Sequence, residues 1–438
     1  MDGKPEAVDP ILLAPLQKTT WRFYLIIAVL AAIAAWGAFA YIQQLNRGLS
    51  VTGLNDRVSW GMYISNFVFF IGISHAGTLI SAILRVGNAE WRRPITRMAE
   101  SITVMAIIVG ALFPLIDLGR PDRFMNVFTF GRIESAILWD FLSIATYLAG
   151  SFLYLYLPMI PDLALIRGKV PTGRFRSLVY RVLTRPWTGS PKQKRSLEKS
   201  IGIMALIIIP VAVSVHTVVS WIFSMTLRVG WRTALFGPYF VAGAIFSGIA
   251  TIIIAMAIFR RAYHLEKYIT VQHFRNLAAL LIVLNLVMIY FTISEYLTAA
   301  YGADAADVVW LQVLSQGPYA FLFWFLVVGG LVTPLFLLAL RRSIATIVAS
   351  AVLINVAMWV ERFLIVVPTM MTPQTEFTWH LYSPSWVEWS ITVGAVAGFA
   401  LMYALFSKVF PIISIWEVTE IPEGAQPQPA PEGQGVVT

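Results

Sequence analysis

Ten long apolar runs restrict the possible folds of this chain more than any other feature. A helix rises 1.5 Å per residue, so about 20 apolar residues cross a hydrocarbon core of roughly 30 Å. The runs cover residues 21–43, 58–84, 98–118, 136–157, 201–223, 236–259, 275–297, 318–340, 344–366 and 387–410. Because a membrane span must pair its own backbone polar groups, we predict an all-α polytopic membrane protein with ten transmembrane helices.

Composition supports this class and excludes several kinds of site. The chain has 438 residues, of which 58% are hydrophobic and 13% charged, whereas a soluble domain has about 25% charged residues. It has no cysteine, so it cannot form a disulfide, a thiolate zinc site or a cysteine-ligated iron–sulfur cluster. The net charge of +9 lies in short loops between apolar runs. This pattern is typical of membrane topology, and we expect no nucleic-acid partner.

The distribution of basic residues predicts the orientation. Most of the 32 lysines and arginines fall on the N-terminal side of the membrane, so both termini are expected in the cytoplasm of a bacterial inner membrane. The N-terminal stretch lacks the pattern of a cleaved signal peptide, so the first helix is expected to remain. Residues 158–200 are predicted to form a basic cytoplasmic loop in contact with anionic lipid.

An internal repeat divides the spans. A shift of 178 residues places Arg97 on Arg275 and Asp117 on Glu295. Repeat-built membrane proteins commonly place their sites in equivalent positions of the two halves. We therefore predict two four-helix bundles, formed by helices 2–5 and 6–9 and flanked by helices 1 and 10. The predicted units are residues 1–57, the bundles 58–223 and 236–366, the last helix 387–416, and a disordered cytoplasmic tail over 417–438.

Ionisable side chains gather in helices 2, 3 and 4, mostly toward their outer ends. His75 lies at mid-depth in helix 2, Asp117 ends helix 3 and Asp140 opens helix 4. Ionisable groups in a membrane are costly and are therefore functional candidates. Imidazole and carboxylate groups can take protons from a reacting hydroxyl, so these three are the catalytic candidates. The alternatives are a hydrogen bond between helices for His75 and a salt bridge to Arg120 for Asp117.

Polar and aromatic residues beside these groups could form the wall of a pocket. Trp60, Tyr63 and Asn66 open helix 2, and the turn GRP after Asp117 is expected to direct Arg120 back toward the same interface. These four are the candidate quinone-binding residues. The aromatic residues could equally belong to the belt that marks a membrane–water interface.

A haem is not expected. His75 lies roughly 22 Å from the outer end of helix 2, and His216 roughly 12 Å from the outer end of helix 5, at 1.5 Å per residue. Two ligands of one haem iron must meet at one depth, so this difference argues against a b-type haem. We therefore expect neither haem nor metal in this chain.

The second bundle carries its own charges. We assign Glu295, Glu361 and Arg362, with His216, to a proton path between the pocket and the cytoplasm. Adjacent helical residues point to different faces, so Glu361 and Arg362 are expected to bond to other helices. The alternative is that these charges only pair to hold the bundle together.

Five segments resemble a known family: DRVSWGMYISNFVFFIGISHAGTLISAILRV, FPLIDLGRPDRF, GPYFVAGAIFSGIA, YITVQHFRNLAALLIV and MWVERFLIVVP. They look like the NrfD-like family of membrane subunits, which includes that of polysulfide reductase, over residues 45–415. Ten helices and the sequence IPDLALIRG look most like the ActC subunit of alternative complex III. In ActC relatives the segment before helix 4 is longer and richer in aromatic residues and proline than RFMNVFTFGRIESAILWD.

The resemblance implies a quinol-binding subunit of a respiratory or photosynthetic electron-transfer complex. It implies menaquinol or ubiquinol oxidised at the periplasmic side, an iron–sulfur subunit there that takes the electrons, and further membrane and cytochrome subunits. Proton translocation would accompany this electron transport. The repeat and the intramembrane acids leave a secondary ion or solute transporter as the alternative. Against it, the expected helices lack paired Gly/Pro interruptions near mid-membrane.

Overall fold

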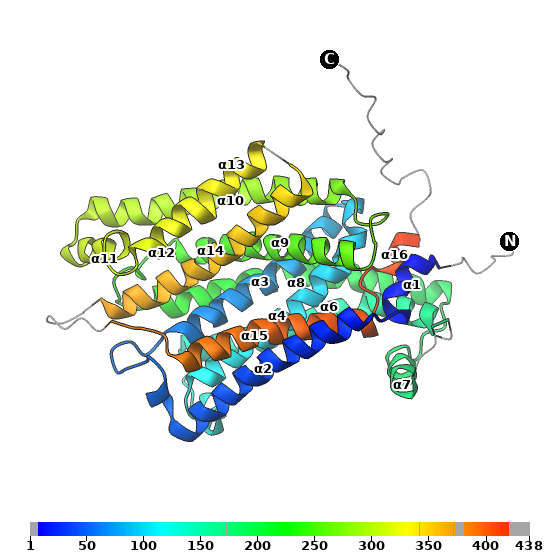
Figure 1. The fold of residues 1–438 in the computed structure, drawn as a ribbon, viewed down its shortest axis with the longest axis horizontal. Coiled ribbons are helices and arrows are strands. Elements are labelled where there is room, and N and C mark those ends of the chain that lie inside the picture. The colour runs from blue at the N-terminus through cyan, green and yellow to red at the C-terminus, as the bar shows by residue number, and fades with distance from the viewer. Residues whose placement is uncertain (1–7, 168, 171–172, 341, 373–380, 420–438) are drawn as a thin grey trace, which may run out of the picture.

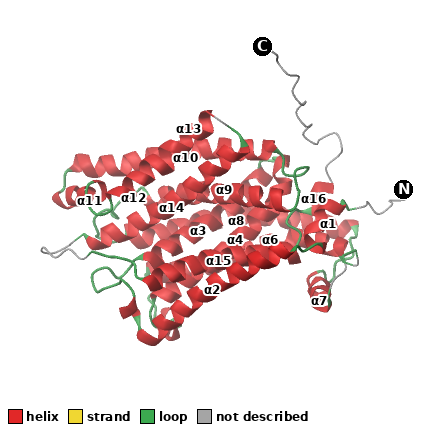
Figure 2. Cartoon of the chain, in the orientation of Figure 1, coloured by secondary structure: helices red, strands yellow, loops and turns green. Residues whose placement is uncertain are grey.

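The computed structural model describes residues 8–167, 169–170, 173–340, 342–372 and 381–419, and over these residues it contains helices and loops only (Figure 1, Figure 2). Within the described ranges, ten spans are long and apolar enough to cross a membrane. They are α2 (Trp21–Arg47), α3 (Met62–Val86), α4 (Arg93–Asp117), α6 (Ala136–Ile166), α8 (Pro191–Ser224), α9 (Phe236–Ala262), α10 (Val271–Gly302), α12–η4–α13 (Ala320–Leu340), α14 (Ile344–Met371) and α15 (Trp386–Val409). The predicted multi-pass membrane protein is confirmed.

Short helical elements lie outside the spans or extend them. They include α1 (Pro10–Gln17), α5 (Asn126–Thr129), α7 (Arg174–Leu183), α11 (Ala305–Ser315), α16 (Ile415–Thr419) and the 3₁₀ turn η2 (Glu90–Arg92) before α4. Much of the expected loop 158–200 is helical, because α6 continues to Ile166 and α8 begins at Pro191. The first three residues of the expected tail belong to α16, and the rest of the tail lies outside the described residues.

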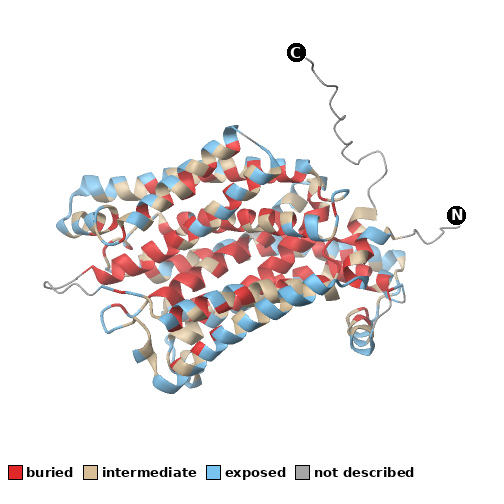
Figure 3. Ribbon diagram, viewed as in Figure 1, coloured by how far each residue is buried: buried red, intermediate tan, exposed pale blue. Residues whose placement is uncertain are grey.

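The core lies around α3 and α9, which are the most buried spans together with α4 (Figure 3). Helix α3 packs against α4, α8, α9 and α14. The contacts have an approximate two-fold pattern, since α3 packs on α8 and α14 just as α9 packs on α14 and α8. Because α3 and α9 also contact each other extensively, the polar residues of both predicted bundles meet at one centre. The division into bundles stays a prediction.

Helices α2 and α15 pair along one side of the molecule (Figure 1). Their backbones meet at Gly37 and Gly394, where a Cβ added to Gly37 would lie 2.8 Å from the Cα of Gly394. Small residues at such crossings let membrane helices approach closely. The expectation that helices 1 and 10 flank the other spans agrees with this pairing.

The eighth span is irregular. Residues Phe325–Val332 form a π-helical stretch between α12 (Ala320–Trp324) and α13 (Thr333–Leu340). The buried amide of Asn285 on α10 donates a hydrogen bond of 3.0 Å to the carbonyl of Leu331 in this stretch. A neighbouring helix thus satisfies a backbone group at the irregularity, as hydrocarbon surroundings require.

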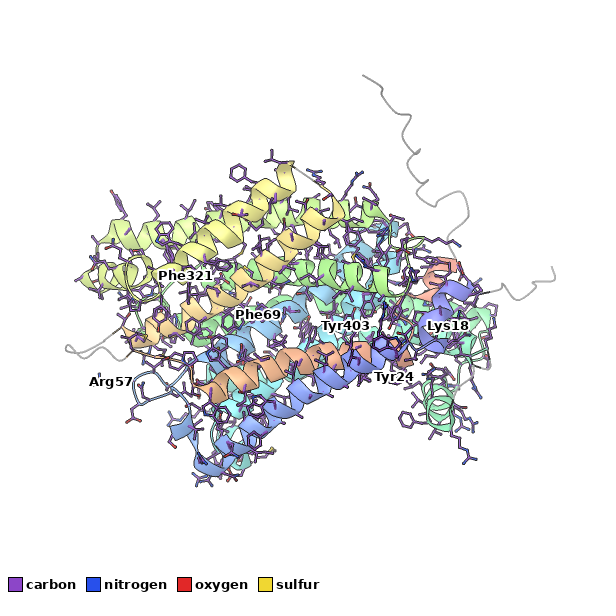
Figure 4. The ribbon with its side chains drawn as sticks, viewed as in Figure 1. Lys18, Tyr24, Arg57, Phe69, Phe321 and Tyr403 are labelled. Carbon is purple, nitrogen blue, oxygen red and sulfur yellow. The ribbon has the colours of Figure 1, made fainter. Side chains whose placement is uncertain are left out.

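Two labelled residues mark the two ends of the molecule. Arg57 lies at the end where α2 finishes and α3 begins, and Lys18 lies at the opposite end, near α1 and α16 (Figure 4). We call these the outer end and the inner end, after the predicted orientation.

Candidate functional site

Two histidine side chains meet in the centre of the molecule. His75 on α3 and His216 on α8 are both buried, and their ring centroids lie 4.0 Å apart. The Nδ1 atom of His75 lies 2.7 Å from the carbonyl of Ile71 one turn earlier. The Nε2 atom of His75 and both ring nitrogens of His216 make no hydrogen bond of good geometry with the described protein groups. Buried polar groups are normally paired, so this pair is a functional candidate.

The contact between the two rings corrects the expected difference in depth. Side chains on a helix tilt toward its N-terminus. Helices α3 and α8 run in opposite directions across the membrane, so the tilt brings His75 and His216 toward each other. The depth argument against a haem is therefore wrong. The absence of haem stays a prediction, which the optical spectrum of the separated subunit tests through a b-type Soret band.

A buried ion pair lies beside the histidines on α14. The Arg362 guanidinium is 3.1 Å from the Glu361 carboxylate and sits over the ring of Phe240 on α9, 4.8 Å from its centroid. Both side chains are 2% exposed. The sequence did not anticipate that these neighbours pair with each other, because both long side chains bend into the same space. Both also meet another helix, as expected, since Arg362 contacts Phe240 and Glu361 interacts with Tyr239 on α9. Neither Glu361 oxygen makes a hydrogen bond of good geometry with the described groups.

A glycine on α9 makes room for this arginine. A Cβ added to Gly243 would lie 2.5 Å from a terminal nitrogen of Arg362. His216 and Arg362 also interact electrostatically. The centre therefore joins a histidine pair from the first half of the chain to an ion pair from the second half.

Asp140 connects the centre to the outer end along α6. It is buried, and its Oδ1 atom has no partner among the described groups. Tyr147 lies seven residues further along α6, so both side chains share one helix face about 10 Å apart along the axis. The Tyr147 ring is 4.5 Å from that of His75, and its hydroxyl donates to the carbonyl of Ser74 over 3.0 Å. These residues form a line from the outer end to the histidine pair.

A cavity of about 510 Å³ lies at the outer end, and its lining includes Trp139, the residue before Asp140. Its lining comes from the start of α6, the end of α8 and the following loop, and consists of Trp139, Trp221, Ser224, Met225, Arg232, Thr233 and Ala234. Two indole rings and a few polar groups are the composition expected of a site for a flat, mainly apolar ligand. The sequence did not identify this lining, because most of it lies in the loop 225–235 and at helix ends.

Asp117 and Tyr63 come together on the other side of α3. The Tyr63 hydroxyl donates to Gln44 on α2 over 2.6 Å, and Gln44 donates to the carbonyl of Ile116 over 2.8 Å. Asp117 interacts electrostatically with Tyr63 and with the buried Glu388 of α15. Its Oδ1 atom has no partner in the described part of the chain. Asp117 thus lies beside the hydrogen-bonded pair of Tyr63 and Gln44. Helix α3 separates it from the outer cavity.

The other predicted wall residues divide between two surroundings. Asn66 donates to Thr392 over 2.7 Å and accepts from the indole of Trp359 over 2.8 Å, so its amide is occupied by structural bonds. Trp60 packs against Phe223 and Trp231, with centroid distances of 5.8 and 6.0 Å. Trp60 therefore packs against the end of α8. Other residues of the same helix end line the outer cavity.

Arg120 does not join the site. It is exposed and forms two hydrogen bonds with Asp122, of 3.0 and 2.9 Å. Neither the expected direction toward the pocket nor the alternative salt bridge to Asp117 is found. The reason is local, because Asp122 lies two residues away and both side chains are in solvent. This bond raises the pKa of Arg120 and lowers that of Asp122.

Glu295 lies apart from Glu361. It is half-buried near the outer end of α10 and interacts with Thr233, which lines the outer cavity. Tyr296 next to it interacts electrostatically with both Glu295 and Glu361. The second half thus has one acid at the outer end and one at the centre.

A charged network at the inner end was missed from the sequence. Arg97 on α4 and Asp162 on α6 form an ion pair of 2.9 Å in which both side chains are 0% exposed. Asp162 also accepts from the backbone N–H groups of Ile415 and Trp416 over 3.1 and 2.8 Å. Glu417 of α16 pairs with Arg85 and Arg92 at 2.7 and 3.2 Å, and Glu100 accepts from Ser81 over 2.9 Å.

The sequence contained a signal for this network. The expected third span began at residue 98, which left Arg97 in a loop, whereas α4 begins at Arg93. Arg93, Arg97 and Glu100 follow the spacing of one helix face. Extending the span by one turn would have placed Arg97 in the same helix as Glu100, which already lay inside the expected span.

Comparisons with known proteins give the chain a family context. A family model described as "Polysulphide reductase, NrfD" matches residues 50–374. A Halobacterium salinarum protein proposed as a membrane component of dimethyl sulfoxide reductase is 28% identical, covering 90% of this chain and 92% of its own. A selenate reductase component of Mesobacillus selenatarsenatis is 23% identical, covering 88% of this chain and 93% of its own. The "Hdr-like menaquinol oxidoreductase integral membrane subunit" of Archaeoglobus fulgidus is 24% identical, covering 92% of this chain and 96% of its own.

Proposed function

The chain belongs to the family "Polysulphide reductase, NrfD", and from this membership we propose that it is the quinol-binding membrane subunit of a respiratory or photosynthetic electron-transfer complex. A relative that covers almost the whole chain is named for menaquinol oxidoreduction. The observation that carries the proposal is the succession of buried polar groups from Asp140, which follows the cavity residue Trp139, through Tyr147 to His75 and His216. We place quinol oxidation at the outer cavity.

The residues fit a quinol by their chemistry. A bound quinol supplies two electrons and two protons. The indoles of Trp139 and Trp221 offer flat apolar faces, and Trp60 supports the end of α8 behind them. The unpartnered Oδ1 of Asp140 accepts a proton from a hydroxyl. The histidine pair, with Tyr147 between it and Asp140, then holds this proton deeper in the protein. The second proton of the quinol is released to water at the outer face, where the cavity opens. Electrons pass to an iron–sulfur partner subunit at the outer, periplasmic face, in a complex with further membrane and cytochrome subunits.

Asp117 with Tyr63 forms a second place where a proton can be held near the outer end. Proton translocation is assigned to the centre, where Glu361 and Arg362 follow the histidines. Glu295 joins this path through Tyr296, on its outer side. Arg120 is left out of the proposed site, because its partner is Asp122.

The test uses the native complex, purified through a tag on this chain. Asp140→Asn should lower the rate of quinol oxidation while the complex still assembles, because the amide cannot accept the proton. The exposed acid Asp122 lies at the same end, and Asp122→Asn serves as the matched control with a normal rate. An assembled Asp140→Asn complex with normal quinol oxidation would refute the placement at the outer cavity.

A secondary transporter is the second candidate, favoured by the two-fold packing around α3 and α9 and by the interrupted eighth span. Copurification distinguishes the two. Cytochrome and iron–sulfur subunits that purify with the chain support the quinol-binding subunit. Isolation of the chain alone, with solute uptake in vesicles, supports the transporter.

A further inference from the structure

Helix α7 has an apolar face that the rest of the described chain does not cover. Phe175, Leu178 and Val182 are 76%, 56% and 60% exposed. Their spacing of three and four residues places them on one side of the helix. The opposite side is fixed to the protein, since Tyr180 donates to the carbonyl of Val409 over 2.5 Å and Arg176 to that of Leu16 over 2.9 Å. In Figure 1, α7 projects from the spans at the inner end, on the side of α1 and α16.

A basic cavity lies close to α7. Its volume is about 350 Å³, and it lies between the end of α6 and the start of α8. Arg167 and Lys194 supply positive charge, Thr184 and Thr188 supply hydroxyls, and the rings of Trp187 and Trp416 complete the wall; Glu198 is the acidic residue of the lining. Residues 167–199 contain lysines and arginines in large excess over this glutamate. The cavity therefore favours an anionic group.

The depth of the cavity matches the lipid headgroup layer. The apolar part of α6 ends near residue 157, and that of α8 begins near residue 201. At 1.5 Å per residue, Pro161 lies about 6 Å, Lys194 about 10 Å and Arg167 about 15 Å beyond these limits. The headgroup region extends roughly 5–8 Å beyond the hydrocarbon on each side of a bilayer. The cavity thus begins in the headgroup layer, and its basic residues lie at the outer edge of that layer, from which their long side chains can reach lipid phosphates.

We propose that the cavity between α6 and α8 binds the headgroup of an anionic phospholipid, while Phe175, Leu178 and Val182 of α7 enter the boundary of the acyl chains. Charge complementarity selects an anionic lipid, and the apolar face of α7 requires a lipid rather than free phosphate. Arg174 and Arg181 flank this face, as is typical of helices that lie in the membrane surface. The site is independent of the proposed quinol chemistry, because it lies at the opposite end of the spans.

Native mass spectrometry of the full chain in detergent tests the headgroup. Phosphatidylglycerol should bind in preference to phosphatidylcholine, and Arg167→Ala and Lys194→Ala should each weaken its binding about fivefold. Arg132→Ala, which removes an exposed charge at the outer end, is the control with unchanged binding. Equal binding of the two lipids, unchanged binding in both variants, or full displacement by inorganic phosphate would overturn the proposal.

A spin label on α7 tests the apolar face. The sequence has no cysteine, so Leu178→Cys gives a single labelling site in the full chain, which is labelled in detergent and reconstituted with phosphatidylglycerol. The label should collide readily with oxygen and poorly with a water-soluble nickel chelate. Ser177→Cys, about 100° around the same helix, should collide more with nickel. A label at 178 that nickel reaches freely would show that α7 lies in water, and one shielded from both reagents would show that a protein covers α7; either result refutes lipid contact.

Discussion

The inner end and the centre of the molecule both contain buried charges, but the charges of the two regions differ in their hydrogen-bond and ion-pair partners. At the inner end, Asp162 accepts from Arg97 and from two backbone N–H groups, and Glu417 has two arginine partners. At the centre, Glu361 has a single arginine partner, Arg362, and neither nitrogen of His216 makes a hydrogen bond of good geometry with the described groups. The ion pairs and backbone bonds of the inner end tie α4, α6 and α16 together. His216 has no such bond in the described part of the chain, so we expect it to remain able to exchange a proton.

The largest expected effect follows from breaking the inner network. Asp162→Ala leaves the buried Arg97 without its carboxylate partner, with hydrogen bonds only to Pro158 and Ser414. Such a loss costs about 3–5 kcal/mol, and we expect most of the chain to fail to assemble. The double variant Arg97→Met with Asp162→Leu should recover part of this loss, because it removes both charges. Thermal unfolding in detergent measures both. A single variant as stable as the native chain would show that the network is not structural.

The next effect concerns activity without loss of stability. His216→Leu should lower quinol oxidation by about 100-fold, the usual contribution of a proton-transferring group. Because His216 has no hydrogen bond to lose, its melting temperature should stay close to that of the native complex. Steady-state turnover and thermal unfolding are measured on the same preparation. A stable His216→Leu complex with normal turnover would place the histidines among passive core residues.

A smaller effect is expected at the contact between α9 and α14. Gly243→Ala should displace the Arg362 guanidinium, because the added Cβ would lie 2.5 Å from one of its nitrogens. We expect fewer protons moved per electron in vesicles, with quinol oxidation largely retained. Gly202→Ala on α8 is a matched control, since a Cβ there meets no atom within 4 Å. An unchanged proton ratio in Gly243→Ala would separate Arg362 from proton movement.

The smallest effect concerns an exposed pair at the inner end. Burial opposes ionisation of Asp9, but hydrogen bonds from Lys267, the N–H of Ile11 and Tyr268 outweigh it and lower its pKa below the usual 3.8. Because the pKa of Asp9 is lower in the docked state, ionised Asp9 stabilises the docking of α1 above pH 3.8. This contribution disappears as the pH falls through the lowered pKa of Asp9. Proteolysis of α1 should increase in that range and not between about pH 5 and 8. The variant Asp9→Asn should show no such increase with acid.

The sequence predicted the spans well and their chemistry only in part. Apolar runs identify hydrocarbon-crossing helices because the bilayer fixes both length and polarity. Asp140, Asp117 and Tyr63 were proposed for the same reason, since polar groups stand out in such runs, and their roles stay predictions. The contact of His75 with His216 was not predictable, because it depends on how two antiparallel helices are offset and on the direction of their side chains.

Other parts of the site depend on tertiary contacts that no short pattern records. Glu388 begins α15 and accepts from Gly53, Ser385 and Tyr382, which places three distant segments together. Burial and the Glu388 carboxylate together raise the pKa of Tyr382. Arg120 was misplaced because the turn after Asp117 gave its approximate position but not its partner, which is Asp122.

Photolabelling tests the central claim most directly. A photoreactive quinone analogue is bound to the native complex, illuminated, and its attachment sites on this chain are identified by peptide mass spectrometry. Our account predicts labels on the peptides that carry Trp139, Trp221 and residues 225–234, with competition by unlabelled menaquinol. Competed labels confined to the inner-end residues 161–198, or to Gln44 and Asp117 on the other side of α3, would contradict the placement of the quinol at the outer cavity.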